Sequence, residues 1–218
     1  MDALSQQNFN PSNANNLAIW KASENGHTEI VKLLLKDERV DPAAKYNDPI
    51  NYASKNGHTE IVQLLLKDER VNPTFSYNAA IREASRYGHT EIVKLLLKDE
   101  RVDPSAYSNY AIEWASVNGH IEIFKLLLED KRVDPTANCN YAIKNASYNG
   151  HTEIVKLLLK DERVDASTGR HFQFAIYGAL CKGHIEIAKL LESKSQSLRN
   201  ITSAPQLSTP LTDNQFFK

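Results

Sequence analysis

Apolar residues recur along the chain at a spacing that predicts α-helices. The clearest stretch lies between residues 28 and 36, where positions i, i+1, i+4 and i+5 are occupied by Ile30, Val31, Leu34 and Leu35. These positions share one face of a helix, and Leu33 widens the apolar stripe. The helix is expected to end before Pro42, because proline cannot continue it.

A second, shorter helix is predicted upstream of this stretch. It is indicated by two dipeptides that begin with alanine and lie one helical turn apart, Ala18-Ile19 and Ala22-Ser23. Small side chains allow neighbouring helices to approach closely. Between the two helices lies Gly26, which is expected to adopt the left-handed conformation that ends the first helix and turns the chain into the second.

The same pattern repeats. A Gly-His pair occurs at Gly26, Gly57, Gly88, Gly119, Gly150 and Gly183, with steps of 31 residues four times and then 33. The text that follows the pair is nearly constant, and GHTEIVKLLLKDERVDP is identical at Gly26 and Gly88. Neither helix of such a unit can bury its apolar stripe alone, so neighbouring units must stack into a continuous core. Six units are predicted over residues 10–191.

Two antiparallel helices per unit, a central Gly-His pair and the string EIVKLLL resemble the ankyrin repeat, whose period is about 33 residues. The resemblance covers roughly residues 9–191. It implies an all-α, ankyrin-like helix-turn-helix solenoid with short β-turn or hairpin fingers. In that family, partners bind the fingers together with the exposed side of the first helix.

Some positions depart from the family pattern. The Thr-Pro-Leu-His opening is absent: only Pro49 keeps the proline, and isoleucine stands in place of the leucine. The usual end of the unit is replaced by Asp-Glu-Arg-Val-Asp-Pro or a close variant of it in the first five units, which leaves the geometry of the fingers open. This shortened variety is similar to the expanded ankyrin arrays of giant DNA viruses of amoebae, a likeness that implies no particular activity.

The two ends differ from the units between them. Residues 1–9 are expected to be an amino-terminal leader or cap. The last unit carries two extra residues within 166–171, which predicts a longer finger, and Glu192 replaces the third leucine of the stripe, which predicts a soluble terminal face. Residues 192–218 are rich in Ser, Thr, Gln and Asn without a period, and are predicted to form a mobile tail.

Composition and charge narrow the class of protein. Hydrophobic residues make up 41% and charged residues 24%, as in folded soluble proteins. The formal net charge of −1 argues against nucleic acid as a partner. No apolar run reaches the roughly 18 residues of a membrane helix, and no signal peptide is evident. Two cysteines agree with a reducing compartment, so the chain is expected to be intracellular, in the cytoplasm or nucleus, of a host cell if it is viral. It is also expected to be a monomer.

Candidate chemistry is sparse. One histidine per unit forms a ladder, because stacked helices lie roughly 8–10 Å apart whereas zinc ligands converge to about 2 Å from the ion. The histidines are therefore interpreted as structural. Cys139 and Cys181 belong to different units, and neither a zinc motif nor a glycine-rich phosphate loop is present. We expect no metal, no cofactor and no enzymatic activity.

Variation among the units gathers in the fingers and the first helix. Six positions before each glycine, the residue changes in charge and size through Trp20, Asn51, Arg82, Glu113, Lys144 and Tyr177. Aromatic residues and arginine carry most of the energy of protein interfaces. The predicted partner-binding residues are therefore Phe75, Tyr77, Arg82, Arg86, Tyr87, Tyr107 and Trp114. The alternative for some aromatics is packing between repeats, and it stays open for Tyr77, Tyr110, Tyr141 and Trp114.

The sequence thus predicts a protein-interaction scaffold that binds an unidentified protein partner through its fingers and the face of the first helix. Two alternatives remain. The chain could be a structural repeat spacer without a specific ligand, or an adaptor that recruits a second factor through its carboxy-terminal tail. A patch of exposed aromatic residues on the concave face would favour the scaffold over the spacer.

Overall fold

The computed structural model describes residues 13–164 and 170–202. These residues form twelve α-helices and no strand, which confirms the predicted all-α helical repeat solenoid. The first helices of the six units are α1 Asn13–Glu24, α3 Ala44–Asn56, α5 Phe75–Tyr87, α7 Ala106–Asn118, α9 Ala137–Asn149 and α11 Arg170–Cys181. The second helices are α2 Thr28–Leu35, α4 Thr59–Leu66, α6 Thr90–Leu97, α8 Ile121–Glu129, α10 Thr152–Lys160 and α12 Ile185–Thr202.

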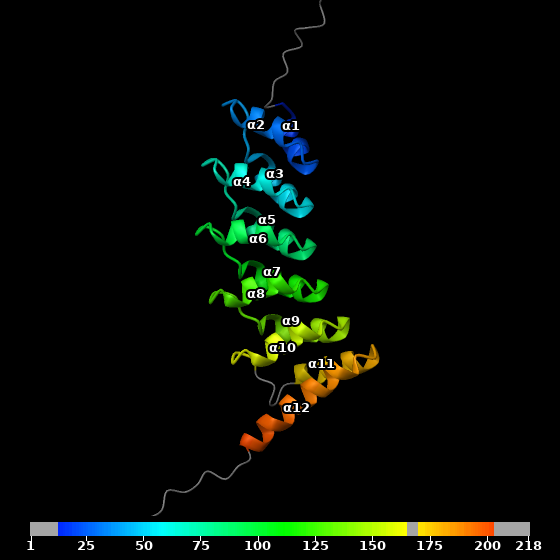
Figure 1. Ribbon diagram of the computed structural model, residues 1–218. Coiled ribbons are helices and arrows are strands. Elements are labelled where there is room, and N and C mark those ends of the chain that lie inside the picture. Colours follow the sequence, from blue (N-terminus) through cyan, green and yellow to red (C-terminus); the bar gives the residue numbers. More distant parts are fainter. Residues whose placement is uncertain (1–12, 165–169, 203–218) are drawn as a thin grey trace, which may run out of the picture.

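The units stack in chain order along one axis (Figure 1). Each first helix contacts the first helix of the next unit, from α1 on α3 to α9 on α11, and the second helices form a parallel layer from α2 to α12. The connections between units project to one side of the stack. They consist of turns, and no β-hairpin finger is present among residues 13–164.

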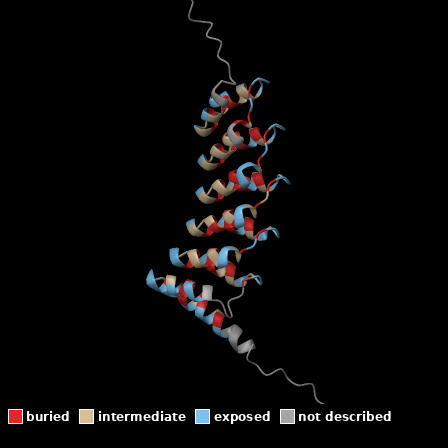
Figure 2. Cartoon of the chain, turned by 180° about the vertical axis from the view of Figure 1, so that it is seen from behind, coloured by how far each residue is buried: buried red, intermediate tan, exposed pale blue. Residues whose placement is uncertain are grey.

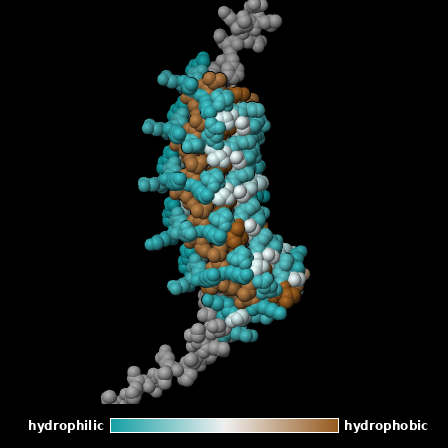
Figure 3. Space-filling model, viewed as in Figure 1, coloured by the Kyte–Doolittle hydropathy of each residue, from teal (hydrophilic) through white to brown (hydrophobic). Residues whose placement is uncertain are grey.

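Buried residues line the interior of the stack between the two layers (Figure 2). In an inner unit, the second helix buries Ile92, Val93 and Leu96 against its neighbours, and the first helix buries Ala80, Ile81 and Ala84. Polar side chains project at regular steps along one edge of the stack, beside a continuous apolar band (Figure 3). The repeated sequence therefore produces a core that runs the length of the array.

Two expectations about the helices are wrong. The first helix is the longer one, with 12 or 13 residues against 8 or 9 for the second helices of the first five units. Leu33 itself does not widen the buried stripe, since it is 67% exposed. Its equivalents in the next four units are half-buried, and they are Leu64, Leu95, Leu126 and Leu157. Ile30 is also 48% exposed, although its equivalent Ile61 is fully buried, because no described unit precedes α2 to cover it.

In α5, α7 and α9, part of the extra length of the first helix comes from a left-handed turn. Ser76, Tyr77 and Asn78 have φ angles of 53° to 57°, and three residues at the start of α7 and of α9 adopt the same conformation. Left-handed backbone costs about 1–2 kcal/mol per residue for L-amino acids, and least for asparagine. The right-handed part of α5 therefore begins at Ala79.

Hydrogen bonds to the next unit support this turn. The buried Asn78 accepts through Oδ1 from the backbone N–H of Asp103 at 2.9 Å, and Asn109 accepts in the same way from Asp134 at 2.7 Å. An unpaired buried amide would cost about 1–3 kcal/mol. The left-handed turn thus points Asn78 and Asn109 at a backbone donor of the following unit, whereas the equivalent Asn140 Oδ1 in α9 is buried without a partner among the described residues.

The Gly-His pair is a second link between units. Gly88 adopts the expected left-handed conformation at the end of α5, with φ +83°. The His120 ring of the next unit lies against it, and its Nε2 donates to the carbonyl oxygen of Arg86 at 3.1 Å. The same contact joins His58 to Glu24 and His89 to Lys55. The structural interpretation of these histidines agrees with this geometry.

The Asp-Glu-Arg-Val segment is a third link. Arg101 binds Asp99 of its own segment through Nε and Nη2 at 2.9 and 2.6 Å. Its Nη1 reaches back to the carbonyl oxygen of Val71 in the preceding unit at 3.1 Å. The buried Val102 anchors the same turn in the core. These residues recur among the units, and from the second unit to the fifth they connect one turn to the turn before it.

The carboxy-terminal unit differs from the prediction. Glu192 is exposed, as expected for a terminal face, but α12 continues to Thr202. The predicted tail therefore begins too early: residues 192–202 are helical, because no glycine or proline interrupts the chain before Pro205. The predicted cap at 1–9, the longer finger around Gly169 and residues 203–218 lie outside the described residues.

We predict that Gly88→Ala destabilises the fold more than Gly183→Ala. Both glycines have positive φ angles, so both variants carry a similar backbone cost of about 1 kcal/mol. A Cβ at Gly88 would lie 2.7 Å from the ring of His120, whereas nothing lies within 4 Å at Gly183. The additional cost at Gly88 should be about 1–3 kcal/mol in urea unfolding. Equal losses at the two sites would contradict a close inter-unit contact.

We also predict an acid-dependent contribution from the Asp99–Arg101 pair. Hydrogen bonds from Arg101 hold the pKa of Asp99 below its usual value of 3.8. A carboxyl group with a lowered pKa in the folded state stabilises the fold above the unfolded pKa, and this contribution disappears as the pH falls through the folded pKa. The free energy of unfolding of wild type should therefore exceed that of Asp99→Asn by up to about 1 kcal/mol at pH 6, and this difference should shrink below about pH 4. A pH-independent difference in thermal unfolding would refute this.

Candidate protein-binding face

Aromatic rings and cationic side chains form a connected cluster on the first helices. It begins with Trp20, whose ring meets that of Tyr52 edge-on at 5.7 Å, and it continues into the third and fourth units. Its members are Trp20, Lys21, Tyr52, Lys55, Tyr77, Arg82, Arg86, Tyr87, Tyr107, Tyr110 and Trp114. We call this set the aromatic–cation cluster. The first helices stack on one another and contribute their buried side to the core. Their opposite, more exposed side carries the rings and cations of the cluster.

The two arginines of α5 bridge to the rings of α7. Arg82 lies over Tyr107 and Tyr110, with its Cζ 4.8 and 5.2 Å from the ring centroids. Arg86 lies 4.3 Å from the centroid of Trp114. Such cation–π contacts contribute about 0.5–1 kcal/mol at exposed sites. They hold the arginines and the rings in fixed relative positions.

The left-handed turn of α5 also positions Arg82. Its Nε donates to the carbonyl oxygen of Tyr77 and its Nη2 to that of Ser76, both at 2.9 Å. The turn raises Tyr77 away from the helix, and the Tyr77 ring then meets that of Tyr107 at 5.8 Å. Tyr77 is 71% exposed and Tyr107 57% exposed. The unusual backbone thus presents two tyrosine rings to solvent.

Six of the seven predicted binding residues belong to this cluster. The seventh, Phe75, is exposed at the start of α5. The exposure of Tyr77 argues against packing as its only role, whereas Trp114, Tyr110 and Tyr141 are half-buried and contribute to both packing and surface.

The cluster also contains residues outside the seven predicted binding residues. Lys55 stands two positions before its glycine, as Arg86 does, in a column that sequence comparison already assigns to the variable face. Tyr52 stands five positions before its glycine, as Trp114 does, and comparison of that column among the units could have found it.

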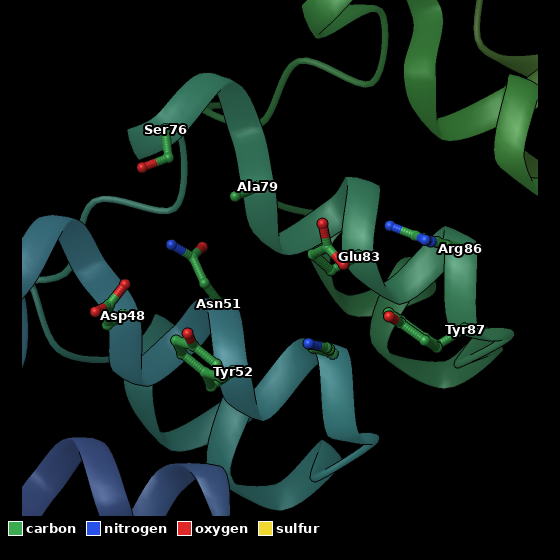
Figure 4. A pocket seen from close by; sticks show the side chains of 9 residues that line it. Asp48, Asn51, Tyr52, Ser76, Ala79, Glu83, Arg86 and Tyr87 are labelled. Carbon is green, nitrogen blue, oxygen red and sulfur yellow. The ribbon is translucent and has the colours of Figure 1, made fainter.

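Two open grooves flank the α5–α7 contact. The first lies between α3 and α5 and has a volume of about 340 Å³; it is lined by Asp48, Asn51, Tyr52, Lys55, Ser76, Ala79, Glu83, Arg86 and Tyr87 (Figure 4). The second lies between α7 and α9 and has a volume of about 510 Å³; it is lined by Tyr107, Ser108, Tyr110, Glu113, Trp114, Asn138 and Tyr141. Both grooves are lined by residues that differ from unit to unit.

Glu113 occupies the floor of the α7–α9 groove. Its side chain is almost buried, with 6% of the residue exposed, and it accepts a hydrogen bond from Asn138 Nδ2. Burial raises the pKa of this carboxyl group, while the hydrogen bond from Asn138 and the charge of Lys144 act in the opposite direction. The corresponding position was predicted to lie on the variable surface, yet here it is covered, because the Asn138 side chain of the next unit lies against it.

Other kinds of site find no support in the described residues. No group of three or more metal-ligating side chains occurs within residues 13–164 and 170–202. Cys139 and Cys181 are exposed free thiols. Within the same ranges, no helix is long and apolar enough to cross a membrane.

Sequence comparison identifies the family. The profile described as ankyrin repeats in three copies matches residues 2–76 and 71–139. These matches cover more than half of the chain, which therefore belongs to the ankyrin repeat proteins. No curated protein matches the chain by sequence. Ankyrin repeats generally serve as protein–protein interaction modules and are typically not enzymes.

We predict that Glu113→Gln stabilises the protein at neutral pH. Because the folded pKa of Glu113 is raised, the wild-type carboxyl group contributes stability that is present below its unfolded pKa, about 4.5, and is lost as the pH rises through the folded pKa. Glutamine keeps the acceptor for Asn138 without the buried charge. The variant should melt at a higher temperature at pH 7, and its advantage should vanish below about pH 4.5. A lower melting temperature at pH 7 would show that the charge itself is needed.

Proposed function

We propose that this ankyrin repeat protein is an interaction scaffold that binds a protein partner along the aromatic–cation cluster and the adjoining turns. The supporting observation is that the positions that link the units differ in their variability from the positions exposed on the first helices. The residues that link one unit to the next are nearly constant, whereas the exposed rings and cations of the first helices change from unit to unit. Tyrosine, tryptophan and arginine are the residues that dominate protein interfaces.

A structural spacer is the less favoured alternative. A spacer needs only the contacts between units, yet Tyr77, Tyr87 and Tyr107 stay 71%, 44% and 57% exposed although each also contacts a ring or cation of a neighbouring unit. Exposed large rings carry a risk of nonspecific association. Exposed rings also occur in the fifth and sixth units, at Tyr148, Phe174 and Tyr177, but only in the third and fourth units do they adjoin the two arginines of α5, which supports recognition of a ligand there.

Affinity capture with paired variants tests the proposed face. The variant Arg86→Ala with Tyr107→Ala should retain the fold, because both side chains lie outside the core, and it should lose the proteins that wild type retains from native cells. Removal of two interface residues of this type weakens binding by about 2 kcal/mol or more, which is about thirtyfold.

The matched control is Glu91→Ala with Lys94→Ala, which removes an exposed ion pair on α6. It should capture the same proteins as wild type, as identified by mass spectrometry. Thermal melts of both variants check the fold. If all three chains capture the same proteins, the binding face lies elsewhere.

A further inference from the structure

Ten described cations have carboxylate partners within the chain, and nine of them lie in the turns or on the second helices. Each turn arginine lies 2.6 or 2.7 Å from an aspartate, and this set is Arg39, Arg70, Arg101, Arg132 and Arg163. On the second helices, four lysines lie 2.7 or 2.8 Å from a glutamate, and they are Lys32, Lys94, Lys125 and Lys156. The charge on these surfaces is therefore neutralised within the chain.

The cations of the aromatic–cation cluster in α3 and α5 are not among these pairs, and they lie against aromatic rings. Within residues 13–164 and 170–202, Lys55, Arg82 and Arg86 form no ion pair. Arg82 uses two of its nitrogens on backbone carbonyl oxygens. Lys55 and Arg86 instead pack against rings, and they share one of them: Lys55 Nζ lies 5.7 Å and Arg86 Cζ 5.5 Å from the centroid of Tyr87.

This arrangement prepares an anion-binding position. The Tyr87 and Trp114 rings restrict the motion of the Arg86 guanidinium group, so less side-chain entropy is lost when it forms hydrogen bonds. Two cations at one ring repel each other, and an anion between them would replace this repulsion with attraction. Arginine binds carboxylate groups through two parallel N–H donors.

The rest of the α3–α5 groove limits where the anion can lie. Asp48 and Glu83 also line it; Asp48 lies at the end away from Arg86 and Tyr87, whereas Glu83 lies one helical turn before Arg86 on α5 (Figure 4). An anion is therefore favoured only between Lys55 and Arg86, on the side of the Tyr87 ring that faces away from Glu83. A continuous polyanion such as a nucleic acid would meet the two carboxylates, and the net charge of −1 provides no general attraction for it.

We propose that the partner presents an acidic peptide segment, with an aspartate or glutamate side chain bound between Lys55 and Arg86. An apolar residue of the same segment occupies the neighbouring α7–α9 groove, whose walls are the rings of Tyr107, Tyr110, Trp114 and Tyr141. The inference rests on the proposed function and adds the chemistry of the partner to it.

Selection from a displayed library of random dodecapeptides tests this inference with the full chain as bait. The selected peptides should be enriched in Asp or Glu beside an aromatic or aliphatic residue. A synthetic peptide of the enriched sequence should bind at least about tenfold more weakly to Lys55→Gln with Arg86→Gln. The same peptide should bind at least about tenfold more weakly when its acids are replaced by Asn or Gln, and binding should weaken as salt is added.

The control variant is Lys94→Gln with Lys125→Gln, which removes the same amount of charge from the second helices and should bind as wild type does. The inference would be overturned if no peptides were selected, or if the selected peptides were not enriched in acidic residues. It would also be overturned if both variants lost binding equally, or if a fifteen-residue oligothymidylate bound more tightly than the peptide. A concentration-dependent dimer that the Lys55 and Arg86 changes abolish would overturn it in favour of a second copy of the chain. Acid-free peptides that are lost on Arg86→Ala with Tyr107→Ala would overturn only the acidic partner and would leave the proposed binding face intact.

Discussion

The contact between successive units is the constraint on which this structure depends. A pair of helices of this length exposes an apolar stripe that only another pair can cover, so no unit is stable by itself. The Gly-His pair makes this contact close. A glycine without a Cβ admits the histidine ring of the next unit, and the ring nitrogen then bonds to a carbonyl oxygen at the end of the first helix. Backbone groups that a helix end leaves unpaired thereby gain partners.

The other links work on the same principle at different places in the unit. The turn arginine bonds to a carbonyl oxygen of the preceding turn, and the asparagine of the left-handed turn bonds to a backbone N–H of the following unit. Small polar contacts, three at each of the steps from the third to the fourth and from the fourth to the fifth unit, supplement a core made mainly of alanine, isoleucine, valine and leucine. Because each link uses side chains at fixed positions, the outer side of the first helix is free to vary.

We propose that the protein recognises its partner through these variable residues on the outer side of the first helices. The left-handed turn is costly for Tyr77 and Tyr107, and it is offset by hydrogen bonds from Arg82 and by the asparagine links. Its effect is to bring tyrosine rings from α5 and α7 together at the surface, where the arginines of α5 lie over the rings of α7. Local backbone strain, inter-unit packing and the candidate binding face are therefore parts of one arrangement.

The sequence by itself determined the architecture, because a repeated period of apolar residues with a glycine between two helices has only one way to bury its stripes. It also predicted the glycine conformation, the structural histidines and most members of the candidate face, since the units provide an internal comparison. The tertiary structure alone decided three other features: the left-handed turns, the covered position of Glu113 and the unpaired state of Lys55 and Arg86. Each depends on side chains about 30 residues apart meeting across the stack, and periodicity within one helix contains no information about such contacts.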